Sequence, residues 1–386
     1  MKKICFITGT RAEYGLLMPL MKAVQEDDNF QLQLLVTGMH LSPEFGLTYQ
    51  QIERDGFTID EKVEMLLSAD SASSIAKSTG LGMIGYTDAL MRLQPDWVIV
   101  LGDRYEVFAA TTTAFLLRIP IAHVSGGEVT EGATDDAMRH AISKMSYLHF
   151  TSTDEYKRRV EQLGESPDRV FNVGATGLDN ILQLDLLSRE ALSESIQFDL
   201  STPYLLVTFH PVTLESQSSE TQFQAFLDAL DAFPDLKVVI TLPNSDADGR
   251  VIINMIQQYV KENAHRVAAY TSLGQLRYLS AMKHAVAVVG NSSSGIIETP
   301  AFHIPTVNIG DRQRGRARVS SIIDCPTDTP SIIEAIQQAV SPSFQAHCKT
   351  VKNPYGDGHT AERIMQILRK VSNETVDLKK SFYDLK

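Results

Sequence analysis

The sequence predicts an α/β protein with two doubly wound domains. Short apolar runs rich in β-branched residues alternate with helix-period stretches from one end of the chain to the other. Because these runs are continuously apolar, they are typical of parallel strands that helices cover on both faces. The chain has 386 residues, which suggests two or three domains of about 100–200 residues each.

The first half of the chain, residues 1–177, contains the elements of one such domain. Its predicted strands are 3–8, 32–38, 97–102, 119–124, 148–152 and 170–174. Its predicted helices are 16–25, 73–93, 106–117, 135–145 and 154–163. The regular alternation predicts a parallel sheet with crossover helices.

The second half, residues 178–359, begins with a Leu- and Ser-rich stretch at 178–203 that has only a weak strand signal. The α/β order then resumes with predicted strands at 204–209, 237–242, 266–270, 285–290 and 306–309. Helices are expected at 222–232, 251–262, 273–284, 295–302 and 331–339. A last helix begins near residue 360, in the segment 360–386, and the residues alone leave open which half it packs on.

Charge and composition exclude several classes of function. The chain has 35 Lys and Arg against 47 Asp and Glu, a net charge of −12. An acidic chain binds nucleic acid and anionic membranes poorly, because their phosphates repel it. No apolar run approaches the ~18 residues that cross a bilayer, and the N-terminal run is too short for a signal peptide. The three cysteines show no CxxC spacing, so we expect a cytoplasmic protein without a disulfide framework.

Two turns between a strand and a helix are candidates for holding phosphate. The first is GTRAEYG at 9–15, where a glycine allows a tight turn, the helix start attracts an anion, and Arg11 adds a bidentate contact. Neither GxGxxG nor GxxxxGK[ST] occurs here, which argues against a nicotinamide dehydrogenase and a P-loop ATPase. The alternative interpretation is a simple turn with a surface arginine.

The second turn is VGNSSSG at 289–295. Its residues Ser292, Ser293, Ser294 and Gly295 offer a diphosphate close backbone approach and short hydroxyl donors. Glu298 follows one helical turn later, where its carboxylate is placed to accept hydrogen bonds from ribose hydroxyls. The alternative is a helix N-cap cluster that binds no ligand.

Carboxylates follow several predicted strands of the first half. Asp103 ends one strand, Glu128 follows the next, and Asp135 and Asp136 come shortly after. Carboxylates at strand ends are the usual general acids and bases of such folds. For the aspartate pair the alternative role is structural, since each stands four residues before a basic side chain at the start of a predicted helix.

Three residues of the second half complete the candidate set. His210 ends a strand and either contacts a phosphate as an imidazolium or is a buried, hydrogen-bonded histidine. The basic run GDRQRGRAR includes Arg312, either a diphosphate ligand or part of a solvated loop. Tyr278 either stacks on a base or belongs to the core. A metal site of His210, His123 and Asp103 is conceivable, but no spacing such as HExxH occurs, so no metal is expected.

Seven segments occur in an order that resembles one family. They are GTRAEYG, LVTGMHLSPEFG, LGDR, GGEVTEGATDDAMRH, TFHPVT, VGNSSSGIIETP and NPYGDGH. From residue 3 to about residue 370 the chain resembles the UDP-N-acetylglucosamine 2-epimerase family, specifically the hydrolysing branch of sialic- and legionaminic-acid synthesis. The resemblance implies a GT-B fold, in which an interdomain cleft binds a UDP-sugar and the final helix returns to the first domain. It also implies a homo-oligomer, a dimer or tetramer, that needs no metal or nicotinamide.

The chemistry that the resemblance implies is an elimination followed by hydration. A base removes the proton beside the anomeric carbon while UDP leaves, and water then adds to the resulting 2-acetamidoglycal. The products are UDP and a free manno-configured sugar. Asp103, Glu128 and Asp135 fall on the family's acid–base carboxylates, and the assignment of base and acid stays open. Asp136 and His210 complete the expected catalytic residues.

The resemblance also assigns the binding residues. The family's diphosphate contacts fall on Arg11, His210, Ser292 and Ser293, its ribose contact on Glu298, and its uracil-packing aromatic near Tyr278. Two other classes would use the same nucleotide site: a GT-B glycosyltransferase, and a nucleotide-sugar sensor without turnover.

One position departs from the family pattern. Where hydrolysing members carry a glutamate just before Gly-Gly-Glu, this chain has Ser125, so Glu128 or Asp136 is expected to take that role. The stretch 129–134 is longer than in N-acetylglucosamine-specific enzymes and resembles the branch that acts on UDP-N,N′-diacetylbacillosamine. That sugar nucleotide is the preferred substrate, and UDP-N-acetylglucosamine is the alternative. The choice between uridine and guanosine stays open.

Overall fold

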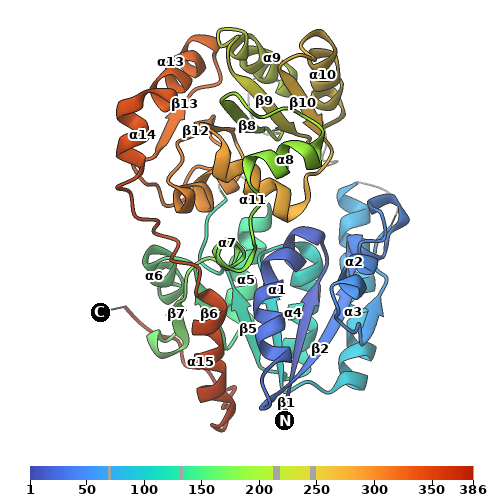
Figure 1. Ribbon diagram of the computed structural model, residues 1–386. Helices are drawn as coiled ribbons and strands as arrows, with labels where there is room; N and C mark the ends of the chain where they lie inside the picture. Colours follow the sequence, from blue (N-terminus) through green and yellow to red (C-terminus); the bar gives the residue numbers. More distant parts are fainter. Residues whose placement is uncertain (68–70, 131–133, 212–217, 244–248, 386) are drawn as a thin grey trace. The chain divides into compact units, whose positions relative to one another are not determined.

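The computed structural model describes residues 1–67, 71–130, 134–211, 218–243 and 249–385. The chain divides into two compact units. Unit 1 contains residues 1–129, 134–180 and 355–385, and unit 2 contains Thr130 and residues 181–354, apart from the gaps just given. Each unit is built around its own parallel sheet (Figure 1).

Unit 1 has a seven-stranded sheet in the order β3-β2-β1-β4-β5-β6-β7, and every neighbouring pair is parallel. The strands are β1 Lys2–Thr8, β2 Phe30–Thr37, β3 Glu61–Val63, β4 Trp97–Leu101, β5 Ile121–Val124, β6 Leu148–Thr151 and β7 Val170–Asn172. The central strands β4, β5 and β6 are buried along their whole length, because helices cover both faces of the sheet. The continuous apolar runs of the sequence reflect this double cover.

The helices of unit 1 form two layers. They are α1 Arg11–Gln25, α2 Tyr49–Arg54, α3 Ala72–Leu93, α4 Tyr105–Leu116, α5 Thr134–Met145, α6 Asp154–Gln162, α7 Gly177–Gln183 and α15 Thr360–Ser372, with short 3₁₀ turns η1 Gly38–Leu41, η2 Pro43–Phe45 and η3 Pro167–Arg169. One apolar core packs α1 and α15 against the sheet, and a second packs α3, α4 and α5 against the other face.

The last helix, α15, is anchored in unit 1. The carboxylate of Asp179 accepts hydrogen bonds from the backbone N–H groups of Thr360 (2.8 Å) and Ala361 (2.6 Å) and so caps the start of the helix. Its apolar face, which includes Ile364 and Leu368, joins the core beneath α1. The helix drawn in red therefore lies beside the blue N-terminal helix (Figure 1).

Unit 2 repeats the architecture with a six-stranded parallel sheet in the order β10-β9-β8-β11-β12-β13. The strands are β8 Tyr204–Thr208, β9 Lys237–Thr241, β10 Val267–Tyr270, β11 Ala287–Gly290, β12 Thr306–Ile309 and β13 Ile322–Cys325. The helices are α8 Arg189–Ile196, α9 Ser219–Leu230, α10 Gly249–Glu262, α11 Gly274–His284, α12 Ser294–Ile297, α13 Thr329–Val340 and α14 Pro342–Cys348, with η4 Thr299–Phe302.

The predicted α/β class with two doubly wound sheets is confirmed, and the differences concern short elements. Strands β3 and β13 lie at sheet edges and include charged residues, so they lack the continuous apolar run of a strand that is buried on both faces. The stretch 178–203 contains most of α7 and all of α8. The helix predicted at 295–302 is divided into α12 and η4, because Pro300 cannot donate the hydrogen bond that would continue it.

The order of the strands places one switch point in each sheet. In unit 1 the chain adds β2 and β3 on one side of β1 and β4 to β7 on the other. In unit 2 it adds β9 and β10 on one side of β8 and β11 to β13 on the other. Ligands of such sheets bind at the carboxyl ends of the strands beside this point. The segments that follow β1, β4, β8 and β11 are therefore the places to look for a site.

Candidate functional site

Unit 1 brings the predicted acidic residues around one arginine. Asp103 follows β4, Glu128 follows β5, and Asp136 belongs to the first turn of α5. Arg139 lies one turn further along α5, and its side chain is only 5% exposed. It donates hydrogen bonds to the carboxylate of Asp103 and to the backbone carbonyl of Glu128 (2.8 Å), and it forms an ion pair with Asp136 (3.5 Å).

The charges of this cluster act on one another. Burial raises the pKa of Asp103, Arg139 opposes that rise, and Asp135 and Glu128 add to it. A carboxyl whose pKa is raised exchanges its proton nearer neutral pH than an ordinary aspartate does. Asp103 is therefore suited to proton transfer, and Arg139 prevents the cluster from accumulating uncompensated negative charge.

Arg139 is the part of this cluster that sequence reasoning missed. The sequence placed it only as a helix partner of Asp135, one turn away. In the structure its guanidinium instead reaches the end of β4, 36 residues earlier in the chain. The sequence carried one signal of this role: a basic residue in the second turn of a helix that starts with two aspartates.

The turn after β5 holds Glu128 and the residue that departs from the family pattern. Ser125 has a left-handed backbone conformation, with φ of +65°, which few non-glycine residues adopt. The carboxylate of Glu128 accepts a hydrogen bond from the Ser152 hydroxyl (3.2 Å), which follows β6. Residues 131–133, the middle of the predicted specificity stretch 129–134, lie outside the described residues.

His123 does not belong to a metal site in this structure. It is fully buried in β5, and its two ring nitrogens bond the Gly102 carbonyl (2.8 Å) and the Ser143 hydroxyl (3.0 Å). Burial lowers the pKa of His123 to about 3, so its ring is neutral. Across the described residues, no group of three or more His, Cys, Asp or Glu side chains is arranged to hold a metal ion.

The turn after β1 is shorter than the sequence predicts. Helix α1 begins at Arg11 instead of near residue 16, because Thr10 and Glu13 form a capping box. The Glu13 carboxylate accepts hydrogen bonds from the backbone N–H groups of Gly9 (2.8 Å) and Thr10 (3.2 Å). Burial, with a contribution from Glu106, raises the pKa of Glu13 to about 7. The exposed Arg11 is thus the first residue of the helix. The backbone N–H groups of Gly9 and Thr10, which would attract an anion, already donate to Glu13.

In unit 2 the residues after β8 and β11 are joined by Asn291. Its side chain accepts from the backbone N–H of His210 (2.7 Å) and donates to the His210 carbonyl (2.8 Å). The Asn291 carbonyl accepts from Arg312 (3.0 Å) and Gln313 (2.9 Å). Asn291 therefore fixes the positions of three segments at the switch point, a role that its place in the sequence did not reveal.

His210 is only partly buried, and its ring is not the fully hydrogen-bonded histidine of the structural interpretation. Burial, aided by the charge of Arg312, lowers the pKa of His210 to about 4, so the ring is neutral at pH 7. Its Nδ1 atom is buried and has no hydrogen-bond partner within the described part of the chain. The neighbouring residues Val212 and Thr213 of the TFHPVT segment lie outside the described residues.

Residues 289–295, which we call the serine loop, are linked to Tyr278 by hydrogen bonds. The Tyr278 hydroxyl bonds the Ser294 hydroxyl (2.7 Å), which in turn bonds the Ser292 hydroxyl (3.0 Å). Ser293 precedes the one-turn helix α12, and Glu298 follows it. The loop, the tyrosine and the glutamate predicted for one site thus occupy one end of the unit 2 sheet.

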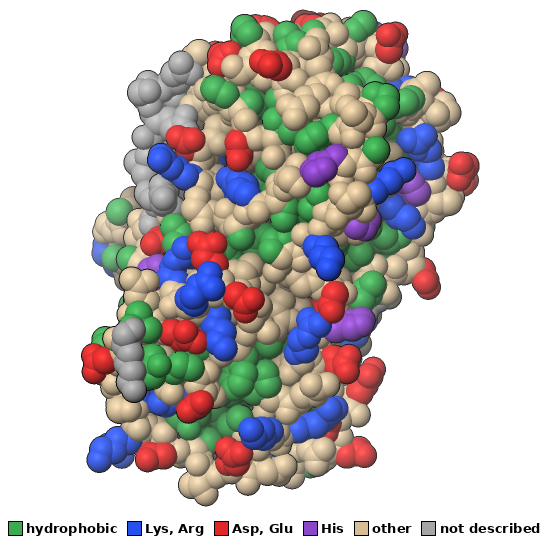
Figure 2. Space-filling view, turned by 90° about the vertical axis from the view of Figure 1, so that its left-hand side faces the viewer, with side chains coloured by type: hydrophobic (Ala, Val, Ile, Leu, Met, Phe, Trp, Pro, Cys, Tyr) green, Lys and Arg blue, Asp and Glu red, His purple; other side chains and the backbone are tan. Residues whose placement is uncertain are grey.

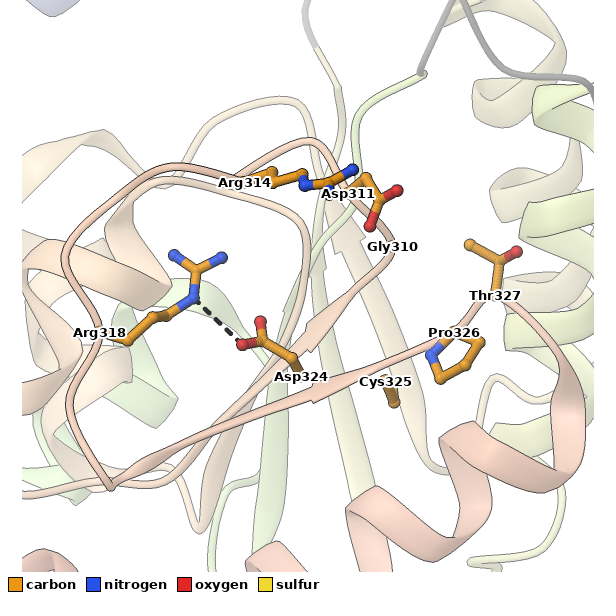
Figure 3. Close-up of a pocket in the computed structure, with 8 residues that line it drawn as sticks. All are labelled: Gly310, Asp311, Arg314, Arg318, Asp324, Cys325, Pro326 and Thr327. Atoms are coloured by element: carbon orange, nitrogen blue, oxygen red, sulfur yellow. Dashed lines mark hydrogen bonds and ion pairs between the residues drawn. The ribbon is translucent and has the colours of Figure 1, made fainter. Parts of the chain in front are cut away.

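The basic run 310–318 is divided in the structure. Arg312 turns toward Asn291, as described above, whereas Arg314 and Arg318 line an open pocket after β12 and β13. In that pocket Arg318 points toward Asp324 and forms an ion pair with it (3.1 Å, Figure 3). Arg312 is therefore bound to the loop 289–295, at the Asn291 carbonyl.

Gly290, at the start of the serine loop, gives a stability prediction. Its φ is +139°, and a Cβ there would lie 2.0 Å from the Thr208 carbonyl oxygen. Gly290→Ala is therefore expected to destabilise unit 2 by about 3 kcal/mol or more. Urea unfolding followed by far-UV circular dichroism measures the loss, while fluorescence of the single tryptophan, Trp97, reports on unit 1.

Gly274→Ala is the matched control for this substitution. Gly274 also has a positive φ (+66°), but no atom lies within 4 Å of a Cβ placed there. It is expected to cost only the backbone strain, about 1 kcal/mol. Equal losses for the two variants would show that the close approach of Gly290 to β8 is not what requires a glycine.

Two further observations describe the surface. Of the helices in the described ranges, none combines the length and apolar character needed to cross a bilayer. On the face shown in Figure 2, acidic and basic side chains are interspersed among the described residues. That face shows no continuous basic stripe of the kind that binds nucleic acid.

Comparisons with known proteins agree on one family. The family model described as UDP-N-acetylglucosamine 2-epimerase matches residues 22–369. The "GDP/UDP-N,N′-diacetylbacillosamine 2-epimerase (hydrolyzing)" of Campylobacter jejuni is 41% identical, over 100% of this chain and 99% of its own. The "polysialic acid biosynthesis protein P7" of Escherichia coli is 37% identical, over 100% and 98%. The structure of UDP-GlcNAc 2-epimerase from Neisseria meningitidis bound to UDP-GlcNAc superposes with a TM-score of 0.82 at 20% identity, over 95% and 100% of the two chains.

Proposed function

Because this chain belongs to the UDP-N-acetylglucosamine 2-epimerase family, we propose that it is a hydrolysing UDP-sugar 2-epimerase. The observation that carries the proposal is the cluster of carboxylates around Arg139 at the carboxyl end of the unit 1 sheet. Such a cluster supplies the proton transfers that an epimerisation needs, whereas a protein that only binds a ligand needs none.

The proposed substrate is UDP-N,N′-diacetylbacillosamine. The name of the C. jejuni relative, at 41% identity over the whole chain, supports this choice. The small, neutral Ser125 beside the acidic cluster also suits a sugar with fewer hydroxyl groups. UDP-N-acetylglucosamine is the second candidate, favoured by the relative named for polysialic acid biosynthesis.

Unit 2 is proposed to hold the nucleotide. His210, Arg312, Ser292, Ser293, Ser294 and Gly295 bind the diphosphate, Glu298 binds the ribose and Tyr278 packs near the base. His210 is neutral in this structure, and an adjacent diphosphate would stabilise its charged form and raise its pKa. Nucleotide binding then takes up a proton at His210.

Unit 1 is proposed to carry out the proton transfers. A carboxylate takes the proton from the carbon beside the anomeric centre, the carbon–carbon double bond forms, and the bond to UDP breaks. Water then adds to the anomeric carbon, and a proton returns to the neighbouring carbon from the opposite face. That first proton is weakly acidic, so its removal needs a positioned carboxylate and a stabilised leaving group. Asp103, Glu128, Asp135 and Asp136 are the proposed acids and bases.

The proposed enzyme is a cytoplasmic homo-oligomer without a metal or nicotinamide cofactor. The three cysteines, Cys5, Cys325 and Cys348, are all free and buried, which fits a reducing compartment.

Incubation with nucleotide sugars and no acceptor tests the proposed function. We expect UDP and a free manno-configured sugar, formed fastest from UDP-N,N′-diacetylbacillosamine. An absolute requirement for an acceptor would indicate a glycosyltransferase instead. Binding of the UDP-sugar without turnover by the intact protein would indicate a sensor.

A further inference from the structure

Two buried glutamates meet at the carboxyl end of the unit 1 sheet and take no part in the proposed reaction. Glu13 belongs to the first turn of α1, and Glu106 belongs to the first turn of α4. A Cβ placed on Gly9 would lie 3.4 Å from the Cγ of Glu106 and 3.5 Å from the Oε2 of Glu13, so both side chains line the same glycine. Glu13 is 6% exposed and Glu106 is fully buried. Acidic residues are rarely buried so deeply unless their charge is compensated.

One arginine compensates one of the two carboxylates. Arg104 donates hydrogen bonds from Nε (3.2 Å) and Nη2 (3.0 Å) to the two oxygens of Glu106. Glu13 accepts from the backbone through Oε2, whereas its Oε1 is buried and has no hydrogen-bond partner among the residues that the structure describes. With both glutamates ionised, the three side chains would carry a net negative charge. A buried charge without a partner is usually removed by protonation.

Backbone encloses both carboxyl groups. Gly38 has a φ of +57°, and a Cβ there would lie 3.1 Å from the Cγ of Glu106 and 3.2 Å from its Oε1. On the Glu13 side, the N–H groups of Gly9 and Thr10 occupy Oε2. Water therefore has little access to the two acids, and a second negative charge at this place would be poorly solvated.

Two other titratable side chains at this end of the sheet supply no positive charge. His40 lies in η1, and burial lowers its pKa to about 4. Tyr86 lies in α3, and burial, with a contribution from the charges of Glu106 and Glu13, raises its pKa. Both side chains are neutral at pH 7. Arg104 is thus the cation that acts on Glu13.

We propose that Glu13 and Glu106 hold one proton between them at neutral pH, carried by the Oε1 of Glu13, and that they form a proton site separate from the cluster around Arg139. The proton leaves one carboxylate to one guanidinium, so the three side chains are neutral together. Arg104 directly follows Asp103 in the chain, and the same site therefore fixes the residue next to Asp103. The inference rests on unit 1 alone and is independent of the proposed reaction.

The pH dependence of stability tests the proposal. An unfolded glutamate has a pKa of about 4.3, so the folded chain would release this proton on unfolding between about pH 5 and 7. Because folding raises the pKa of Glu13, its contribution to stability is complete at low pH and is lost as the pH rises toward 7. Glu13→Gln keeps the size of the side chain but cannot ionise. The unfolding constant of the wild type divided by that of Glu13→Gln is expected to rise about tenfold per pH unit over this range. Urea unfolding followed by Trp97 fluorescence measures both constants.

Glu155→Gln is the matched control. Glu155 also lies in the first turn of a helix of unit 1, but it is exposed and pairs with Arg159 (2.9 Å). The corresponding ratio should stay constant within about twofold, because exposed ion pairs contribute little to stability. A ratio for Glu13→Gln that is equally independent of pH would overturn the proposal.

Carbon-13 NMR of the glutamate carboxyl groups follows the proton directly in the wild-type chain, whether or not a variant folds. One glutamate is expected to titrate between about pH 6 and 8, while exposed glutamates titrate near about pH 4.3. That signal should be absent from Glu13→Gln, and its titration should move about one pH unit or more lower in Glu106→Gln, because the charge of Glu106 raises the pKa of Glu13. A wild-type spectrum without such a titration, or a signal that persists in Glu13→Gln, would contradict the proposal.

Discussion

Replacing Asp103 by asparagine is expected to reduce turnover about 10³-fold or more while UDP affinity stays within a few-fold of wild type. Asp103 follows β4, its carboxylate belongs to the cluster around Arg139, and its raised pKa suits proton transfer. The amide keeps the size of the side chain but cannot take up a proton, and such losses are typical of a missing general acid or base. Release of UDP measures the rate, and calorimetry measures the affinity for UDP.

The control for this variant is Asp154→Asn. Asp154 belongs to the first turn of α6, where it accepts a hydrogen bond from the exposed Asn172 side chain. That substitution should leave both the rate and the affinity unchanged. An Asp103→Asn enzyme with the wild-type rate would remove Asp103 from the chemistry.

Replacing Arg139 by leucine is expected to change both stability and pH dependence. The substitution removes a nearly buried cation from Asp103 and Asp136 and takes a hydrogen bond from the Glu128 carbonyl. Breaking such a pair leaves uncompensated charge, so we expect a loss of about 2–4 kcal/mol in the free energy of unfolding. Urea unfolding followed by Trp97 fluorescence measures this loss in unit 1.

The pH effect of Arg139→Leu has a defined sign. Arg139 lowers the pKa of Asp103, so its removal raises that pKa further. If Asp103 must be ionised, the acidic limb of the activity profile moves to higher pH. If it must be protonated, the alkaline limb moves to higher pH. An upward movement of one limb is expected in either case, and the limb that moves identifies the role of Asp103.

Two variants control for the loss of Arg139. Arg139→Lys keeps the charge and should move the limb less. Arg159→Leu removes a guanidinium that bonds Gly127 and Glu155 but no residue of the acidic cluster. It should leave the pH profile in place. A profile that Arg139→Leu does not move would mean that Asp103 is not controlled by this arginine.

The sequence predicted the fold well where strands are buried on both faces. Continuous apolar runs marked β4, β5 and β6, because a strand covered on both sides has no polar face. The edge strands β3 and β13 gave no such signal, since each includes at least one charged residue. Helix α1 begins earlier than predicted, although Thr10 and Glu13 carry the spacing of a capping box.

The sequence predicted the candidate site only in part, because contacts between distant residues connect its parts. Carboxylates and hydroxyls at strand ends can be read from the order of elements. The groups that connect them cannot, because those contacts join residues far apart in the chain. Asn291 bonds the backbone of His210, 81 residues away, and Arg139 reaches Asp103 across 36 residues. Neither contact leaves a local pattern in the sequence.

Carboxylates of unit 1 are proposed to remove and return a proton at the carbon beside the anomeric centre. NMR analysis of the products formed in deuterated water tests it most directly. We predict UDP and a free manno-configured sugar that carries deuterium at that carbon. A released sugar that keeps its original hydrogen and configuration would contradict the account, because UDP would then have left without any proton transfer at that carbon.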